Sequence, residues 1–311
     1  MFNLEREKII NKILKLNKKN PKILFQAPEG LKLMVSREME EIEKELKNKG
    51  VEGDLFLWLN SCYGACDIPN VDNIDLIIHY GHEPLDYIKY KNVIFIPAYH
   101  EFNEEEKKKI LEDVERFYKI GYKIVTTIQY KKLLKKFNPK IILGCRGEVE
   151  GEKILYVGTG RFHPLMLAYK YNKEILIYNP ISKKFDKIGK EEIERFLKKR
   201  LSRVSKLLLN PPKKVGLILS TKPGQCRYKL LKEIEEELKK REIKYIKFLA
   251  DNISPNLLFY DVDCYIIIAC PRIVLDDFKL YDKDIYTVEE FKMFLNKSFD
   301  YKFDEVKEED F

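Results

Sequence analysis

The segment Lys22-Ile-Leu-Phe-Gln26, followed by Ala27-Pro-Glu-Gly30, decides the fold. It predicts an apolar strand that passes through a loop with Pro and Gly into a helix, which extends to about Lys49. The same signals return at Lys123–Thr127 and at Val215–Ser220, so the three strands begin at positions 23, 123 and 215. This nearly even spacing predicts three similar units in one chain.

Each unit continues with further short apolar runs. The expected strands are Asp54–Leu59, Asp75–Tyr80 and Asn92–Pro97 in the first unit, Lys140–Gly144, Lys153–Gly158 and Glu174–Tyr178 in the second, and Ile243–Leu249 and Cys264–Ala269 in the third. Nearly uniform apolar strands separated by helices are typical of parallel sheets buried on both faces. The expected fold class is therefore α/β, with three similar doubly wound domains, each holding a small, mostly parallel sheet flanked by helices, arranged around one central site.

The chain length of 311 residues favours two or three domains over one. We expect the domains at residues 1–100, 101–210 and 211–311, with Asn210-Pro-Pro-Lys213 marking the second boundary. The acidic end after Ser298 is expected to be frayed.

The composition indicates a cytosolic globular protein. Hydrophobic residues make up 45% and charged residues 35% of the chain, which argues against disorder. Residues Met1–Asn20 mix acidic and basic side chains at helical spacing, so they predict an amphipathic helix rather than a signal peptide. No uncharged apolar run approaches eighteen residues, the length that a membrane span needs.

The net charge of +8 is spread along the chain as Lys and Glu mixtures, for example at Glu104–Lys109 and Lys232–Lys240. Such mixtures predict solvated helix faces. Because no basic patch is interleaved with aromatic residues, direct nucleic-acid binding is not expected.

Six cysteines in a cytosolic chain do not favour a disulfide framework, so they are either buried apolar residues or metal ligands. Three of them, Cys66, Cys145 and Cys270, each follow a predicted strand in a different unit, and the carboxyl ends of parallel strands are where ligands gather. Glycines beside them admit a bulky group, and Arg146 and Arg272 would favour the thiolate form. The pattern predicts an iron-sulfur cluster with three ligands and one open iron.

A single cysteine at a strand end is more often a small buried apolar residue than a ligand. Cys226 opens a predicted helix and Cys264 starts a predicted strand, so both are assigned to structure. Cys62 stands four residues before Cys66, and the two could bind zinc together, but no second close pair completes such a site. Cys62 is therefore interpreted as a bystander.

Six motifs in order resemble the archaeal-type 2-(3-amino-3-carboxypropyl)histidine synthases of diphthamide biosynthesis, over most of the chain. They are Gln26–Leu31, Tyr63–Asp67, His79–His82, Leu143–Cys145, Ser220–Gln225 and Ala269–Arg272. The resemblance implies a homodimer in which Cys66, Cys145 and Cys270 bind a [4Fe-4S] cluster. Two stretches depart from the family pattern: Asn60-Ser-Cys62 before the second motif and Glu83-Pro84 after the third.

The resemblance also implies an unconventional radical reaction. The enzymes of this family cleave the bond between sulfur and the methionine γ-carbon of S-adenosylmethionine and leave methylthioadenosine. The 3-amino-3-carboxypropyl radical adds to C2 of a histidine in elongation factor 2. An unidentified electron donor must reduce the cluster.

The S-adenosylmethionine contacts are expected in the motif loops, where backbone N–H groups before a helix could receive the methionine carboxylate and Lys222 could neutralise it. The candidates are Gln26, Glu29, Gly30, His79, Gly81, Thr221, Lys222, Gly224, Gln225 and Arg272. The alternative is that these loops are only turns and helix caps, and that loop histidines such as His79 and His82 are simply exposed. The loop Gly158–His163 holds the same place in the second unit, with a weak phosphate-like pattern.

Two other functions remain open from the residues. One is a dehydratase similar to quinolinate synthase, in which an open iron of a three-cysteine cluster acts as a Lewis acid. The other is a zinc-stabilised protein that binds RNA or the ribosome through its basic surplus.

Overall fold

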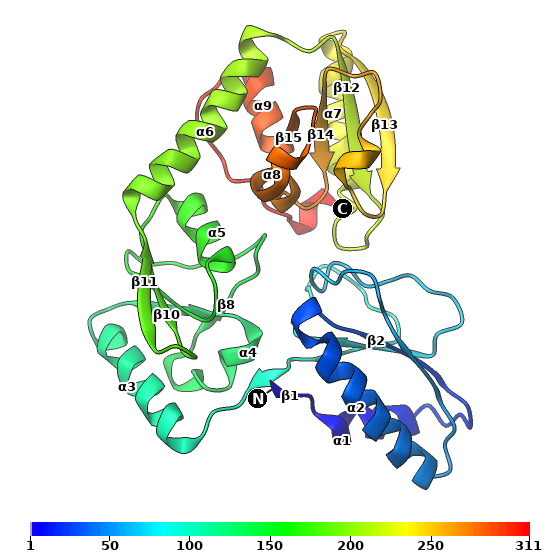
Figure 1. Ribbon diagram of the computed structural model, residues 1–311. Helices are drawn as coiled ribbons and strands as arrows, with labels where there is room; N and C mark the ends of the chain where they lie inside the picture. Colours follow the sequence, from blue (N-terminus) through cyan, green and yellow to red (C-terminus); the bar gives the residue numbers. More distant parts are fainter. Residues whose placement is uncertain (1) are drawn as a thin grey trace. The chain divides into compact units, whose positions relative to one another are not determined.

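The computed structural model describes residues 2–311 and divides the chain into two compact units (Figure 1). The first unit comprises the chain up to Lys109, with Ile128–Lys136 and Lys222–Gly224. The second unit comprises Ile110–Thr127, Phe137–Thr221 and Gln225–Phe311. One mainly parallel sheet lies in the first unit and two lie in the second.

The sheet of the first unit is entirely parallel, in the order β3-β2-β4-β5. Its strands are β2 (Lys22–Gln26), β3 (Asp54–Leu57), β4 (Leu76–Tyr80) and β5 (Val93–Ile96). The helices α1 (Arg6–Leu14) and α2 (Glu29–Asn48) pack on it, and Ile9, Val35 and Phe25 share one buried cluster. The short strand β1 (Phe2–Asn3) precedes these four strands in the chain and β6 (Tyr99–His100) follows them. The two short strands pair antiparallel with each other.

The second sheet has the order β11-β10-β9-β7-β8, and only the pair of β10 and β11 is antiparallel. Its strands are β7 (Lys123–Thr126), β8 (Lys140–Ile141), β9 (Ile154–Val157), β10 (Ile175–Asn179) and β11 (Lys184–Ile188). The helical segments of this part of the chain are α3 (Glu104–Lys119), α4 (Ile128–Lys131), the 3₁₀ turn Lys135–Phe137 and α5 (Phe162–Tyr171). All four residues of β9 are buried, as expected of a central strand.

The third sheet is entirely parallel, in the order β13-β12-β14-β15. Its strands are β12 (Lys214–Ser220), β13 (Lys244–Ala250), β14 (Cys264–Ile268) and β15 (Ile285–Thr287). The helices are α6 (Lys190–Leu209), α7 (Tyr228–Lys240), α8 (Arg272–Asp277) and α9 (Val288–Asn296), with 3₁₀ turns at Pro255–Leu257, Phe278–Leu280 and Glu308–Asp310. The N-terminus of α9 is fixed by a capping box, in which the Thr287 side chain accepts from Glu290 N and the Glu290 side chain accepts from Thr287 N.

The three sheets share one connectivity. In each, the first strand lies between the second and the third, and the fourth follows the third. The expected α/β class with three mainly parallel sheets flanked by helices is confirmed. The expected strand Lys140–Gly144 was too long, because the chain leaves the sheet after Ile141. The domain limits 1–100, 101–210 and 211–311 stay a prediction.

The end of the chain is not frayed, contrary to the expectation for the residues after Ser298. Asp304, Val306 and Asp310 are buried. The reason is the buried guanidinium of Arg227, which is paired with both Asp304 and Asp310 at 2.8 Å. A buried cation needs such partners, so the acidic tail packs against the fold instead of leaving it.

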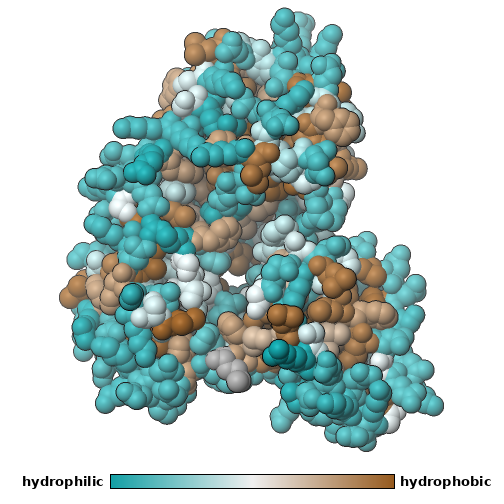
Figure 2. Space-filling view, viewed as in Figure 1, coloured by the Kyte–Doolittle hydropathy of each residue, from teal (hydrophilic) through white to brown (hydrophobic). Residues whose placement is uncertain are grey.

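No helix among residues 2–311 is long and apolar enough to cross a membrane. Figure 2 shows a mainly hydrophilic surface at the lower right of the view, over the C-terminal part of α2. The predicted solvated face at Glu104–Lys109 lies on α3, where none of these six residues is buried.

Glu235 on α7 is a pH-dependent link between this helix and β13. Its carboxylate accepts from Lys247 Nζ at 3.0 Å and Tyr245 Oη at 2.9 Å, and these bonds lower the pKa of Glu235 to about 2. A depressed pKa stabilises the fold above the unfolded-state value and ceases to do so as the pH falls through the folded-state value. Glu235→Gln should therefore lower the free energy of unfolding at neutral pH, and the difference from the parent should vanish between about pH 5 and about pH 2. Denaturant titration over that pH range measures the difference in the free energy of unfolding. A difference that stays constant with pH would contradict the assignment. Glu236→Gln, at an exposed position of the same helix, is the control.

Candidate functional site

Cys145 and Cys270 lie against each other in the second unit. Cys145 stands in the loop after β8 and Cys270 directly follows Ala269 at the end of β14. A hydrogen bond from the Cys145 side chain is the main cause that lowers the pKa of Cys270, with Arg272 acting in the same direction and burial opposing it. Two thiols from different sheets are thus in contact, and one of them favours the thiolate form.

The loop that carries Cys145 is a tight turn rather than a strand tip. Leu143 N donates to the Arg146 carbonyl at 2.8 Å, which turns the chain around Cys145. Gly147 N donates to Glu305 Oε1 at 3.3 Å, and Lys170 Nζ donates to the same oxygen at 2.8 Å. The C-terminal tail therefore holds the Cys145 loop in place.

Arg272 begins α8, two residues after Cys270, and its side chain is buried. Its guanidinium carbon lies 3.9 Å from the ring centroid of Phe162, and its Nε donates to Asp276 Oδ2 at 2.8 Å. A Cβ on Gly144 would meet the same Phe162 ring at 1.8 Å. Only glycine fits there, so the Cys145 loop packs closely against the aromatic ring that covers Arg272.

Cys66 belongs to the first unit, in the loop after β3. Asp67 N donates to the Gly64 carbonyl at 3.0 Å, and Tyr63 N donates to Asp67 Oδ2 at 3.3 Å. The Cys66 carbonyl accepts from Gly224 N at 3.1 Å. The loop after β3 and the segment Lys222–Gly224 are therefore joined through the backbone of Cys66. A meeting of its thiol with those of the second unit stays a prediction.

Lys222 is buried and its Nζ lies 2.8 Å from Asp67 Oδ1. The same ammonium lies 5.0 Å from the ring centroid of Tyr63. The positive charge that was expected to meet a methionine carboxylate is thus already paired with a carboxylate beside Cys66. This buried ion pair joins Lys222 to the Cys66 loop, and a contact of Lys222 with S-adenosylmethionine stays a prediction.

Gln26 and His79 are fully buried at the ends of β2 and β4, and they contact each other. Gln26 Oε1 lies 2.7 Å from His79 Nδ1, and Gln26 Nε2 donates to the Asp67 carbonyl at 2.6 Å. The interpretation of His79 as an exposed loop residue was wrong, because β4 runs through to Tyr80 and its five residues are all buried. Gly81 follows with φ of 81°, a conformation that favours glycine.

The remaining candidates lie at the starts of helices or in turns. Glu29 is exposed at the start of α2 and pairs with Lys32 at 2.6 Å, and Gly30 beside it has open space around it. Thr221 is exposed and its N–H donates to the Ala250 carbonyl at 3.0 Å, whereas Gln225 is buried. Whether any of these contacts S-adenosylmethionine stays a prediction.

The two cysteines assigned to structure are placed accordingly. Cys264 starts β14, is buried, and burial raises its pKa to about 12. Cys226 lies two residues before α7 and packs against the core of the third sheet, where burial raises its pKa. The expectation that Cys226 opens the helix was therefore off by two residues.

Sequence reasoning missed Asp67, Phe162 and Glu305 as residues that shape the site. Asp67 stands next to Cys66 in the chain, so its position was a usable signal. Phe162 lies within the loop Gly158–His163, which was singled out for a phosphate-like pattern and not as a partner of Cys145. Glu305 is far in sequence from Cys145, and nothing in the chain order points to it.

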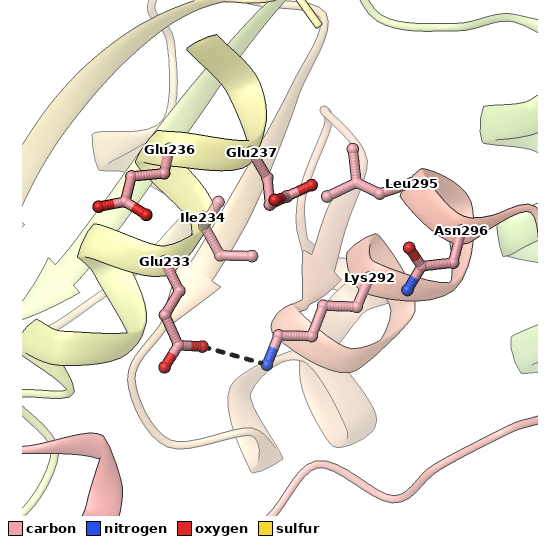
Figure 3. Close-up of a pocket in the computed structure, with 7 residues that line it drawn as sticks. All are labelled: Glu233, Ile234, Glu236, Glu237, Lys292, Leu295 and Asn296. Carbon is pink, nitrogen blue, oxygen red and sulfur yellow. Dashed lines mark ion pairs between the residues drawn. The ribbon is translucent and has the colours of Figure 1, made fainter. Parts of the chain in front are cut away.

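A surface pocket lies away from all of these residues, between α7 and α9 in the second unit (Figure 3). Glu233, Glu236 and Glu237 line it from α7, and Lys292 on α9 reaches across to Glu233 at 3.6 Å. A second pocket continues along α9 toward Asp304 and Glu305. Neither holds a thiol, so the cysteine chemistry lies elsewhere.

Gly224 offers a direct test of the Cys66 loop. A Cβ at Gly224 would lie 2.5 Å from both Cα and Cβ of Cys66, and backbone atoms cannot move aside cheaply. Gly224→Ala should lower the free energy of unfolding by about 1–3 kcal/mol and displace Cys66, which should lower iron retention. Gly189→Ala is the control, because its nearest contact would be an ordinary 3.5 Å. Equal stability and equal iron content in the two variants would contradict the contact.

The chain has three mainly parallel sheets, and cysteines lie in the loops beyond their strands. Two of these cysteines, Cys145 and Cys270, are in contact. This arrangement defines a class of α/β protein that can hold a thiolate-bound metal centre at the strand ends. Residues 27–306 match the family model described as "Putative diphthamide synthesis protein". The chain belongs to this diphthamide synthesis family.

The curated relatives cover nearly the whole chain. A 2-(3-amino-3-carboxypropyl)histidine synthase from Methanocaldococcus jannaschii is 61% identical over 100% of this chain and 95% of its own length. A protein of the same name from Pyrococcus horikoshii is 31% identical over 98% of this chain and 94% of its own length. The chain is similar to relatives that are named as enzymes.

The solved structures agree with the fold. The crystal structure of Dph2 from Pyrococcus horikoshii matches with a TM-score of 0.79 at 29% identity, covering 98% of this chain and 95% of that chain. The crystal structure of the same protein with a 4Fe-4S cluster matches with a TM-score of 0.78 at 28% identity. A homologue with this fold thus holds the kind of cluster that the three cysteines predicted.

Proposed function

We propose that this chain transfers the 3-amino-3-carboxypropyl group of S-adenosylmethionine to C2 of a histidine in elongation factor 2, the first step of diphthamide biosynthesis. Cys66, Cys145 and Cys270 are the proposed ligands of a [4Fe-4S] cluster. The observation that carries the proposal is the contact between the thiols of Cys145 and Cys270, in a chain 61% identical to a named synthase. The family match favours this activity over a quinolinate-type dehydratase and over a zinc-stabilised RNA-binding protein.

The donor set fits such a cluster. Thiolates are the usual ligands of iron-sulfur clusters, and the contact with Cys145 favours the thiolate of Cys270. The Cys145 loop is closely packed, since a Cβ at Gly144 would lie 1.8 Å from the Phe162 ring and one at Gly147 would lie 2.8 Å from Met166 Cε. When bound, the cluster supplies one electron and an open iron position to the carbon–sulfur bond of S-adenosylmethionine.

The chain's own residues would bind and position. Glu305 and Lys170 hold the Cys145 loop, and Arg227 binds the Ala269 carbonyl, at 3.4 Å, just before Cys270. Arg272 is a cation within the proposed site, where it can attract the methionine carboxylate. The other proposed contacts with the cosubstrate are Gln26, Glu29, Gly30, His79, Gly81, Thr221, Lys222, Gly224 and Gln225.

We further propose a homodimer in the cytoplasm that receives its electron from a separate donor. The protein partner is elongation factor 2, and neither a membrane nor nucleic acid is part of the proposed reaction. The positive net charge of +8 would favour the approach of an acidic partner surface.

The test is an anaerobic assay of the reconstituted protein with dithionite, elongation factor 2 and S-adenosylmethionine labelled in the aminocarboxypropyl carbons. The expected result is label in elongation factor 2 together with an equal amount of methylthioadenosine. A variant of elongation factor 2 without its target histidine is the control. Two outcomes with cluster-loaded protein would refute the proposed transfer. One is that elongation factor 2 stays unlabelled and no methylthioadenosine forms, and the other is that methylthioadenosine forms without label in elongation factor 2.

A further inference from the structure

Three metal-ligand side chains that the proposed cluster does not use converge in the first unit. Cys62, His79 and His82 each offer one ligand atom, and these atoms all lie within 4.8 Å of one another. Cys62 and His79 are buried and His82 is half-buried. Cys62 lies in the loop after β3, His79 lies within β4, and His82 lies in the loop after β4, so the three side chains come from two segments that are separate in the chain.

The partners of His79 leave one of its nitrogens ready for a metal. Gln26 Nε2 donates to the Asp67 carbonyl, which turns Gln26 Oε1 toward His79 Nδ1 at 2.7 Å. Because an amide oxygen only accepts, Nδ1 carries the proton, and Nε2 of His79 accepts from His82 Nδ1 at 2.9 Å. Metal-binding histidines in proteins are held in this way, with the second nitrogen donating to an oxygen.

The backbone around the three side chains is fixed. Gly81, between the two histidines, donates its N–H to the Ile96 carbonyl at 2.8 Å and accepts from Gln129 Nε2 at 2.6 Å. On the other side, Lys32 Nζ donates to the Leu59 and Asn60 carbonyls at 2.8 Å and 3.0 Å, just before Cys62. Such a frame lowers the entropy cost of assembling a metal site.

The repeated connectivity places these loops where the other two sheets carry thiols. Cys62 follows the second strand of its sheet, as Cys145 does in the second sheet. His82 follows the third strand, as Cys270 does in the third sheet. The first unit therefore combines both ligand-bearing loops within one sheet, and its loop after β3 carries Cys62 as well as Cys66.

We propose that Cys62, His79 and His82 form a second metal site, distinct from the three cluster cysteines, that binds a divalent ion of the zinc class. One thiolate and two imidazoles suit zinc, which takes such ligands in tetrahedral geometry, and three protein ligands leave the fourth position for water. On binding, the Cys62 thiol gives up its proton to solvent as the sulfur–metal bond forms, and the His82 proton that bonded to His79 Nε2 shifts to the other nitrogen of the His82 ring. No electron is transferred.

The competing explanation is a hydrogen-bonded histidine pair beside a buried core thiol. It accounts for the contact of His79 with His82, and it predicts that no metal binds there. The two explanations differ in metal content, so neither depends on turnover and the metal site does not rest on the proposed transferase activity.

Zinc and iron per chain, measured by elemental analysis of the full-length reconstituted protein after zinc addition and gel filtration, test the site. The parent and Cys264→Ser should retain about one zinc per chain, and Cys62→Ser and His82→Gln should retain at least tenfold less with unchanged iron. Cys145→Ala should also keep its zinc although its cluster is lost, which separates this site from the cluster. Zinc-free parent protein, zinc retained in both site variants, or iron lost together with zinc in them would each overturn the proposal.

Two further readouts guard against variants that merely misfold. Co²⁺ in place of Zn²⁺ should give a thiolate-to-metal charge-transfer band in the parent, and the band should be absent in Cys62→Ser but present in Cys264→Ser. Gln26→Leu keeps all three ligands and should weaken zinc binding roughly 10–100-fold. Far-ultraviolet circular dichroism equal to that of the parent shows that each variant is folded. A folded Gln26→Leu with unchanged affinity for zinc would contradict the role that the Gln26–His79 contact has in the proposed site.

Discussion

Cys270→Ala is expected to abolish both iron retention and aminocarboxypropyl transfer. Three thiolates are the full set that the proposed cluster has, so the loss of one leaves two irons of the cluster without protein ligands. The variant also removes the partner of the Cys145 thiol. Substitution of a residue that only supports a metal ligand already lowers metal affinity or activity roughly 10–100-fold. Loss of a ligand itself should therefore lower turnover by more than about 100-fold. Iron content and the labelling assay measure the two effects, and Cys66→Ala and Cys145→Ala should behave alike.

The matched controls are Cys226→Ala and Cys264→Ala. Both thiols pack in the core of the third sheet and have no thiol partner that the structure describes. Their removal should cost packing energy alone and leave iron content unchanged. Full activity of Cys66→Ala, Cys145→Ala or Cys270→Ala would contradict the ligand assignment, whereas iron loss in Cys226→Ala would show that the ligands were chosen wrongly.

The sheets were predictable because each strand is a short, nearly uniform apolar run with Gly or Pro behind it. The starts of β2, β7 and β12 were each placed within one residue. β11 was missed because all but one of its five residues are exposed, so its pattern carries no buried run. β15 was missed because Ile285–Thr287 is too short to stand out from the loops around it.

The site was predictable only where neighbours in the chain are also neighbours in space. The positions of Cys66, Cys145 and Cys270 beyond strands followed from the apolar runs before them. The buried contact of Gln26 with His79 joins residues 53 positions apart and had no local signal. Cys62 was interpreted as a bystander because the sequence does not show that His79 and His82 lie beside it in the fold.

The tail was mispredicted for a related reason. Asp304, Glu305 and Asp310 resemble a solvated acidic end in the sequence. In the fold Arg227 binds Asp304, Asp310 and the Glu305 carbonyl, and it also reaches the Ala269 carbonyl before Cys270. Because Glu305 holds Gly147 beside Cys145, the tail supports both thiols of the second unit. The acidic end is thus part of the framework of the proposed cluster site.

Arg227→Met is expected to lower the free energy of unfolding by about 3–5 kcal/mol. Burial opposes the charge of Arg227, but Asp304 and Asp310 outweigh this effect and raise its pKa. Methionine fills a similar volume and leaves two buried carboxylates without their cation, which is the costly way to break a buried ion pair. Urea titration measures the loss, and the tail should become accessible to proteases because its anchor is gone.

A partly exposed ion pair on α7 provides the control. Arg241→Met removes a partly exposed partner of Glu237 on α7 and should change stability far less, because solvent screens that pair. The triple variant Arg227→Met, Asp304→Asn, Asp310→Asn should be more stable than Arg227→Met alone, because no unpaired charge stays buried. If Arg227→Met were as stable as Arg241→Met, the tail would not depend on this arginine, and the link from the C-terminus to Cys145 and Cys270 would need another anchor.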